Sequence, residues 1–287
     1  MRQALQKYGL FYLVIFLFII FILLFTYNLE NKNKDLTFAM LDVGQGDAIF
    51  IESPSGFQIL VDSGRDKKVL SELSHQMSFF DRSIDLVIMT NPDLDHIGGF
   101  VEVLEKYKVD KILEPGTYND SEVYKKIEEI IKGKNISRYL ARAGTRIPLG
   151  DGASLDILFP DKDVSTWDNN DGSIVARLIY GNHSFILTGD ASIKTEKYLL
   201  DKFNQEVFDV DFLKVGHHGS RTSTSLEFLQ AITPRYALIS SGIGNKYGHP
   251  HDEVIDRLSS LNIEILRTDE RGTIVFTCDK IELCKLK

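Results

Sequence analysis

The sequence has few cysteines, no excess of positive charge and a single long hydrophobic run. Two cysteines among 287 residues are too few for a disulfide-built scaffold or a thiolate zinc cluster. Acidic residues outnumber basic ones by 41 to 33, which gives a formal net charge of −8. No global field therefore attracts nucleic acid, and any phosphate binding must come from a local patch or a metal.

Both cysteines, Cys278 and Cys284, lie near the end of the chain in "TIVFTCDKIELCKLK". A hairpin that turns at Asp279 and Lys280 would not place them opposite one another. A disulfide is therefore compatible with their spacing but is not implied by it. Neither cysteine is expected to bind a metal.

The long hydrophobic run extends from Leu10 to Phe25, inside an uncharged stretch from Tyr8 to Leu29. At about 1.5 Å per residue a helix of this length spans the roughly 30 Å core of a bilayer. A secretory signal peptide is the alternative, but its cleavage site needs small residues that "LLFTYNLE" does not offer. We expect an uncleaved membrane anchor over 1–28, a linker over 29–35 and one domain over 36–287.

The orientation of this anchor depends on the charges that flank it. Arg2 and Lys7 on one side are balanced by Lys32 and Lys34 on the other, and the free amino terminus adds one positive charge before the span. The positive-inside rule then predicts a single-pass protein of the cell membrane, with a cytoplasmic tail and the domain on the outer face.

Two stretches of the remaining chain resemble each other, "DAIFIESPSGFQILVDSG" at 47–64 and "GSIVARLIYGNHSFILTGDAS" at 172–192. Each has two apolar strands around a glycine-containing turn and runs into an aspartate, which predicts two similar hairpins. Further strands are predicted at 36–42, 84–90, 154–160, 210–216, 235–241 and 274–278, and helices at 97–107, 121–132, 192–203, 225–232 and 250–261. The pattern predicts an α/β fold of two similar halves packed face to face.

Potential metal ligands gather just after these predicted strands. "NPDLDHIGG" brings together Asp93, Asp95 and His96; taken alone, this turn could instead cap the following helix. Asp190 ends another strand, and five of the seven histidines follow strands in glycine-flanked loops, at 217, 218, 249, 251 and at 96 itself. A buried structural histidine is a poor explanation for all five. His75 and His183 are expected on the surface.

Six ordered segments carry a family resemblance: "MLDVGQGDAIFI", "LVDSG", "DLDHIGG", "FILTGDA", "LKVGHHGSRTS" and "NKYGHPH". Together they resemble the metallo-β-lactamase superfamily, and within it the hydrolase-like domain of the ComEC/Rec2 DNA-internalisation proteins. The likeness runs from about residue 36 to 276. It implies an αββα sandwich and a hydrolase that uses one or two divalent metal ions, manganese or zinc.

The resemblance also implies roles for individual residues. Asp95 and His96 match ligands of a second metal. Asp190 matches a carboxylate that bridges two metals, and one of His217 and His218 matches a ligand of the first metal. His249 is the candidate for the last ligand, while Asp42, Gln45 and Asp47 match a supporting loop. The full set of candidate ligands is Asn91, Asp93, Asp95, His96, Asp190, His217, His218 and His249.

Asn91 departs from this family pattern, which has histidine at that position. An amide and carboxylates suit a harder ion than zinc, such as manganese. Three readings stay open: two manganese-like ions, a single ion held by Asp95, His96 and Asp190, or a domain that only binds.

If the site is active, the resemblance implies a phosphodiesterase, and for this branch a nuclease acting on DNA. Asp93 or Asp95 would accept a proton, and Arg221 would stabilise charge on the phosphate, unless it is a solvent-exposed loop cation. Lys214, Arg235 and Lys246 are further candidates for phosphate contacts. The alternatives are a non-catalytic DNA-binding or assembly subunit and a hydrolase of a small anionic substrate.

Overall fold

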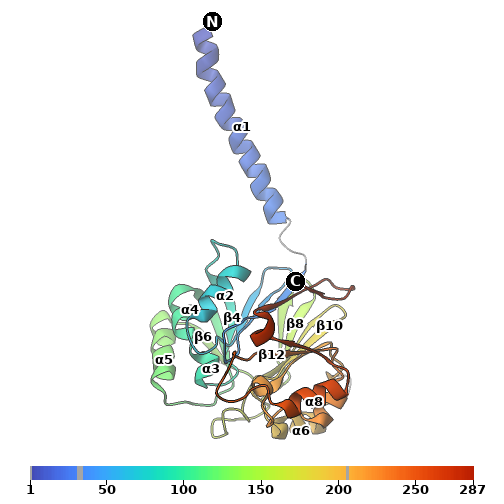
Figure 1. Ribbon diagram of the computed structural model, residues 1–287. Helices are drawn as coiled ribbons and strands as arrows, with labels where there is room; N and C mark the ends of the chain where they lie inside the picture. Colours follow the sequence, from blue (N-terminus) through green and yellow to red (C-terminus); the bar gives the residue numbers. More distant parts are fainter. Residues whose placement is uncertain (1, 31–34, 205–206) are drawn as a thin grey trace. The chain divides into compact units, whose positions relative to one another are not determined.

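A computed structural model describes residues 2–30, 35–204 and 207–287 (Figure 1). The chain divides into two compact units, Met1–Lys34 and Asp35–Lys287.

The first unit contains one helix, α1 (Arg2–Glu30). Within the ranges that the structure describes, no helix combines the length and the apolar character that crossing a bilayer requires. The transmembrane anchor expected here is therefore not supported by the structure, although the segment is helical. Most of the expected linker, 29–35, lies outside the described residues, and the expected location on the outer face of a membrane stays a prediction.

The second unit contains two sheets. One is eight-stranded, in the order β15-β14-β1-β2-β3-β4-β5-β6, and the other is seven-stranded, in the order β13-β12-β11-β10-β9-β8-β7. The strands of the first are β1 (Leu36–Met40), β2 (Ile49–Glu52), β3 (Gln58–Val61), β4 (Ser83–Ile88), β5 (Lys108–Glu114), β6 (Ser137–Leu140), β14 (Ile274–Cys278) and β15 (Lys285–Leu286). Those of the second are β7 (Arg146–Gly150), β8 (Ala153–Phe159), β9 (Val175–Tyr180), β10 (His183–Leu187), β11 (Phe212–Lys214), β12 (Tyr236–Ile239) and β13 (Glu264–Arg267).

Helices cover the outer face of each sheet (Figure 1). The helices that do so are α2 (Lys68–Gln76), α3 (Leu94–Ile97), α4 (Phe100–Lys106), α5 (Glu122–Lys134), α6 (Ile193–Lys202), α7 (Leu226–Ile232) and α8 (Asp252–Ser260), and the short α9 (Thr268–Arg271) follows β13. One apolar core lies between the two sheets, where Phe38 stacks on Phe185. A second joins the first sheet to α2, α4 and α5, and a third joins the other sheet to α6, α7 and α8. The layers are those of the expected αββα sandwich.

The two halves repeat one strand pattern, as the sequence predicted. In the first sheet the antiparallel pair β2-β3 leads into the parallel strands β4, β5 and β6. In the second sheet the antiparallel pair β9-β10 leads into the parallel strands β11, β12 and β13. Because parallel strands present the same ends together, each half collects its strand-end loops at one edge of its sheet.

Several details differ from the sequence expectations. The helix predicted at 97–107 is α4, a separate short helix, α3, precedes it, and neither α2 nor β5 was anticipated. His183, expected on the surface, is buried as the first residue of β10. The sequence did not indicate this because the polar residues just before His183 made it look like part of the turn, whereas it begins an apolar strand.

The break between α3 and α4 brings two chain segments into close contact. A Cβ atom at Gly98 would lie 2.0 Å from the backbone oxygen of Arg65. Only a residue without a side chain fits there. The close approach holds the loop after β3 against α3, which carries Asp95 and His96.

We therefore expect Gly98→Ala to destabilise the protein by about 1–3 kcal/mol or more, because the neighbouring backbone cannot yield. Chemical denaturation with a two-state fit measures this change. Gly133→Ala is the matched control, since Gly133 lies in α5 with open space around it, and it should be neutral or stabilise by up to about 1 kcal/mol. Equal stability of the two variants would contradict the assignment.

Candidate metal centre

The candidate centre lies where strand ends of the two sheets meet. From the first sheet, Asp62 follows β3, and Asp95 and His96 lie in the short helix after β4. From the second, Asp190 follows β10, and His218 follows β11. All but Asp95 are almost fully buried. The loops therefore bring residues separated by more than a hundred positions into one cluster.

His96 connects the two halves of the cluster. Its Nδ1 lies 2.8 Å from Oδ2 of Asp62, and its Nε2 lies 3.1 Å from Oδ2 of Asp190. Asp62 is itself fixed by Thr90, whose backbone N–H and hydroxyl donate to its carboxylate at 2.8 and 2.6 Å. A carboxylate that holds one nitrogen of a histidine orients the other nitrogen toward a metal. Asp62 therefore aims Nε2 of His96 into the cluster.

His218 is aimed into the cluster from the opposite side. Its backbone is left-handed, with φ 56°, and its Nδ1 lies 3.1 Å from the carbonyl oxygen of Ser240 and 3.2 Å from Asp47. Its Nε2 lies 3.5 Å from Asp95 and 3.7 Å from Asp190. Of the two adjacent histidines that the sequence could not distinguish, the buried one is His218.

His217 and His249 lie at the rim of the cluster. Nε2 of His217 is 3.7 Å from Asp190, and its ring lies 5.5 Å from that of His249. Burial and the nearby His218 and His217 lower the pKa of His249 to about 4. The imidazole of His249 is therefore neutral at neutral pH, as metal ligation requires.

The donor set fits a divalent cation. Three groups of side chains place one donor atom each within 4.8 Å of one another: Asp95, His96 and His218; Asp47, Asp190 and His218; and Asp47, Asp62 and His96. Nε2 of His96, Nε2 of His218 and Oδ1 of Asp190 are buried without a hydrogen-bond partner. Buried polar atoms are seldom left this way, and a cation bound in one of the donor groups would give such an atom a partner.

The charges of the cluster favour positive charge at its centre. Burial disfavours the imidazolium form of His218, but Asp190 and Asp47 outweigh burial and raise its pKa to about 10. Asp190 and Asp62 likewise raise the pKa of His96 well above its usual value against the effect of burial. A cation would take the place of the protons that these imidazoles otherwise hold.

A buried lysine that the sequence suggested for phosphate contact belongs to the floor of the cluster. Lys214 forms an ion pair with Asp47 and donates to the carbonyl oxygen of Gly189 at 2.7 Å. Its ammonium also lies 3.8 Å from Asp190. Lys214 therefore compensates buried carboxylates and is not available to a phosphate from solvent. Sequence reasoning missed this role because nothing in "DFLKVG" shows that the side chain points inward.

Asn91 is fully buried, but its side chain is used within its own turn. Its Oδ1 accepts a hydrogen bond from the backbone N–H of Asp93 at 2.9 Å, and its Nδ2 donates to the hydroxyl of Ser173 at 3.3 Å. The same hydroxyl accepts from the backbone N–H of Asp190 at 3.3 Å. Asn91 thus shapes the turn and links it to the Asp190 loop, and its ligation of a metal stays a prediction.

Asp93 and Arg221 lie outside the three donor groups. Oδ1 of Asp93 accepts from the amide of Asn169 at 2.7 Å, and burial raises the pKa of Asp93. The guanidinium of Arg221 is exposed and lies 3.8 Å from Glu253. The structure therefore places Arg221 as a surface cation, which was one of the two expectations for it.

A second buried carboxylate holds the loop that carries His217 and His218. Glu196 of α6 accepts from the backbone N–H groups of Thr224 and Ser225, the latter at 2.9 Å. Arg257 of α8 donates to the carbonyl oxygens of Ser223 and Thr224, each at 3.1 Å. Two helices therefore anchor a loop whose histidines have left-handed backbones.

Comparison with known proteins agrees with this fold. The family model described as the metallo-beta-lactamase superfamily matches residues 41–243. ComE operon protein 3 of Bacillus subtilis is 31% identical over 271 residues, which cover 88% of this chain and 34% of that protein. Competence protein ComA of Neisseria gonorrhoeae is 30% identical over 236 residues, which cover 82% of this chain and 31% of that protein. The chain thus spans about a third of the length of these relatives.

Among solved structures, the chain is similar to Igni18, a metallo hydrolase of the archaeon Ignicoccus hospitalis, with a TM-score of 0.54 and 15% identity. The match covers 85% of this chain and 100% of that one. At this identity the likeness concerns the fold alone.

The charges of the cluster predict that a divalent metal binds with release of about one proton or more at neutral pH, because His96 and His218 must lose protons to become ligands. The apparent affinity should therefore rise with pH and fall in acid. Isothermal titration calorimetry of the whole protein in two buffers of different ionisation enthalpy counts the protons. His75→Ala, which changes an exposed histidine, should leave the count unchanged. Binding heat that is independent of the buffer would contradict this account.

Proposed function

The chain belongs to the metallo-beta-lactamase superfamily and is ComEC/Rec2-like, and from this premise we propose that it is a metal-dependent phosphodiesterase that cuts DNA. Membership of the superfamily and the candidate metal cluster both support a metal-dependent hydrolase. The competence context comes from the relatives, and the substrate is the part that we propose. Superfamily folds carry several chemistries, so the substrate must be argued from the site.

The observation that carries the proposal is the set of buried imidazole and carboxylate donor atoms that His96, His218 and Asp190 bring into one cluster. Nε2 of His96 and Nε2 of His218 both lie near Oδ2 of Asp190, at 3.1 and 3.7 Å, so imidazole and carboxylate meet in one cluster. A divalent metal bound there would acidify a water molecule and offset negative charge on a transferring phosphoryl group. Asp62 and Asp47 would keep the two imidazoles oriented while the substrate binds.

Asp95 and Asp93 would have separate roles. Asp95 lies 3.5 Å from Nε2 of His218 and belongs to a donor group, so it would serve as a ligand. Asp93 lies beside the cluster with one oxygen held by Asn169 and outside the donor groups. Its second oxygen would accept the proton from the attacking water, because a carboxylate within reach of that water suits general-base work.

A second candidate is a hydrolase of a small anionic substrate. Two of the cations suggested for phosphate contact are engaged elsewhere, Lys214 in the buried floor and Arg221 at Glu253. A long polyanion draws its affinity from many Lys and Arg contacts, whereas a small phosphate ester needs fewer. Activity on a small phosphodiester without activity on DNA would favour this candidate.

If the proposal holds, the full chain cuts single-stranded DNA with manganese or zinc and stops when a chelator is added. Asp95→Ala and Asp190→Ala should each lower the rate by roughly 100-fold or more, because each removes a metal ligand. A gel assay measures the loss, with Asp110→Ala as the control because that aspartate is exposed on β5. A folded protein that binds metal but cuts neither DNA nor a small phosphodiester would contradict the proposal.

The identity of residue 91 should govern which metal supports activity. Asn91→His introduces an imidazole where the turn now holds an amide, and imidazole favours zinc over manganese relative to oxygen donors. We expect the ratio of activity with zinc to activity with manganese to rise. Asn169→His, a matched change at the neighbouring amide, should not raise it. The same ratio in the Asn91 variant and the unchanged protein would show that Asn91 acts only on the turn.

A further inference from the structure

One end of the second unit lies opposite the candidate metal centre. The centre is built on the carboxyl ends of β3, β4, β10 and β11. At the other end of the first sheet, strand pairing places Leu36 of β1 opposite Cys278 of β14. The first residues of β3 and β4 lie at this end too, because both strands run parallel to β1.

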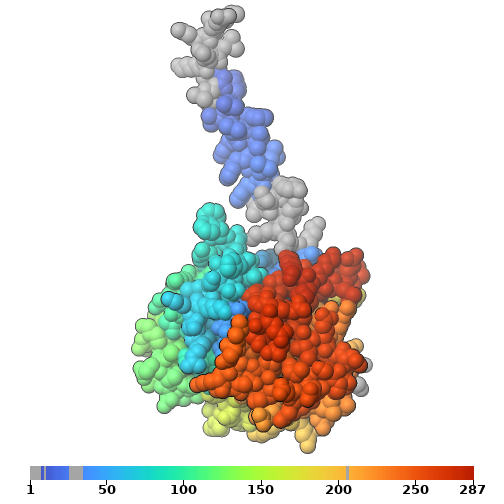
Figure 2. All heavy atoms as spheres, in the orientation of Figure 1, coloured from blue at the N-terminus to red at the C-terminus, as the bar shows by residue number. Residues whose placement is uncertain are grey.

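Two loops at this end carry apolar side chains that the described part of the domain leaves largely exposed. In the loop between α2 and β4, Phe79 and Phe80 are 77% and 89% exposed. In the loop between β14 and β15, Ile281 and Leu283 are 79% and 64% exposed. Both loops lie at the top of the domain in Figures 1 and 2. We call these four residues the apolar end.

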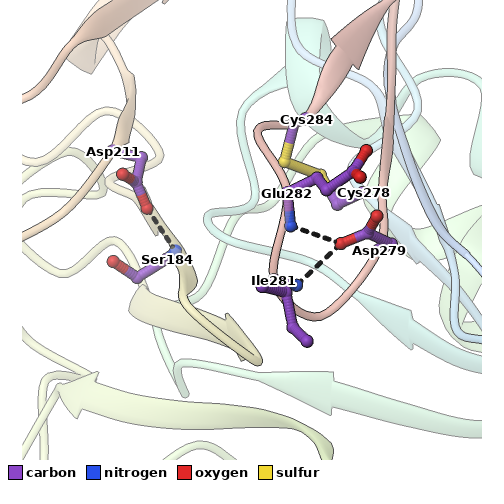
Figure 3. Close-up of a disulfide and its surroundings, with 7 residues drawn as sticks. All are labelled: Ser184, Asp211, Cys278, Asp279, Ile281, Glu282 and Cys284. Carbon is purple, nitrogen blue, oxygen red and sulfur yellow. Dashed lines mark hydrogen bonds between the residues drawn. A yellow bond between two sulfur atoms is a disulfide. The ribbon is translucent and has the colours of Figure 1, made fainter.

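The loop that carries Ile281 and Leu283 is held in shape. A disulfide between Cys278 and Cys284 closes it (Figure 3). The connection between β14 and β15 spans 279–284, so it is longer than the tight hairpin considered from the sequence. Oδ1 of Asp279 accepts from the backbone N–H groups of Ile281 and Glu282 at 2.7 and 2.6 Å. The exposed apolar side chains therefore project from a closed and internally bonded loop.

The turn between β9 and β10 of the second sheet packs against this loop. The backbone N–H of Asn182, in the turn between β9 and β10, donates to the carbonyl oxygen of Lys280 at 3.0 Å. A Cβ atom at Gly181 would lie 2.1 Å from that same oxygen. The aromatic loop is tied to its sheet as well, because the amide of Gln58 donates to Asp81 at 2.8 Å. Both tips are therefore fixed on the body of the sandwich.

We propose that the apolar end contacts the surface of a lipid bilayer and that the candidate metal centre faces away from it. Large apolar side chains left in water at one end of a domain mark an interaction surface. Phenylalanine and aliphatic side chains at loop tips suit the boundary between headgroups and acyl chains.

The separation of the two tips favours lipid over a protein partner. Between β4 and β14 lie β3, β2 and β1, which at about 4.8 Å per strand puts the tips on the order of 20 Å apart. A protein interface has one continuous apolar core, whereas a bilayer surface accepts separate insertions. The chain also enters the domain at this end, since Asp35 precedes β1, and the apolar run 10–25 lies shortly before it in the sequence.

Two lysines near the tips lie beside acidic residues. Lys108 lies 2.9 Å from Asp110, and Lys285 lies 3.7 Å from Glu282. Because the charges within these two pairs compensate one another, we expect contact to depend more on apolar insertion than on anionic lipid.

Tryptophan substitution and quenching by brominated phosphatidylcholine vesicles test this orientation in the full chain. Phe80→Trp and Ile281→Trp should each lose emission and shift to shorter wavelength when vesicles are added. Ile243→Trp is the matched control: Ile243 is 85% exposed but follows β12, at the end that carries the metal centre. It should change no more than the unmodified protein, whose single tryptophan, Trp167, gives the background.

Equal quenching at positions 80, 281 and 243, or no quenching at 80 and 281, would overturn the proposal. A shift at position 80 that grows with protein concentration and needs no vesicles would assign the apolar end to a second copy of the chain instead. Quenching that requires anionic lipid would show that charge, and not apolar insertion, makes the contact.

Discussion

The contact of His96 with two carboxylates is the interaction on which the rest of the centre depends. Asp62 belongs to the first sheet and Asp190 to the second, and the imidazole between them is fully buried. The two halves of the chain repeat one strand pattern, so each contributes an aspartate from the corresponding strand end. His96 can occupy this position only because the glycine pair after it lets the chain pack closely on the loop after β3. The position of His96 therefore depends both on its two carboxylate partners and on the close packing of the segments that carry them.

Burying several carboxylates together is costly unless positive charge accompanies them. The protein supplies part of that charge permanently through Lys214, which pairs with Asp47 beneath the cluster. The remaining compensation comes from imidazoles that can exchange protons for a cation, and this is why a charged interior is compatible with a stable fold. Asn91 fits the same scheme, because an amide shapes the turn without adding a further charge to the interior.

The sandwich separates two kinds of surface. Parallel strands in both halves bring their carboxyl ends to one end of the sandwich, where the polar loops gather. The turns at the opposite end carry none of the candidate metal ligands. At that end the structure holds apolar tips in place with a disulfide and short hydrogen bonds. A domain built this way can face a surface with one end while its chemistry stays accessible at the other.

The sequence alone determined the fold class, the two similar hairpins and the gathering of aspartates and histidines after strands, because hydrophobic periodicity, turn residues and motif order are local properties. It also identified Asp95, His96 and Asp190 as neighbours through the family resemblance. The tertiary structure decided what depends on the direction of a side chain: that His218 points inward while His217 lies at the rim, that Lys214 is buried under the cluster, that Arg221 faces solvent, and that Cys278 and Cys284 close a loop. These outcomes depend on packing between segments far apart in the chain, and no local pattern specifies which way a residue at a strand end will face.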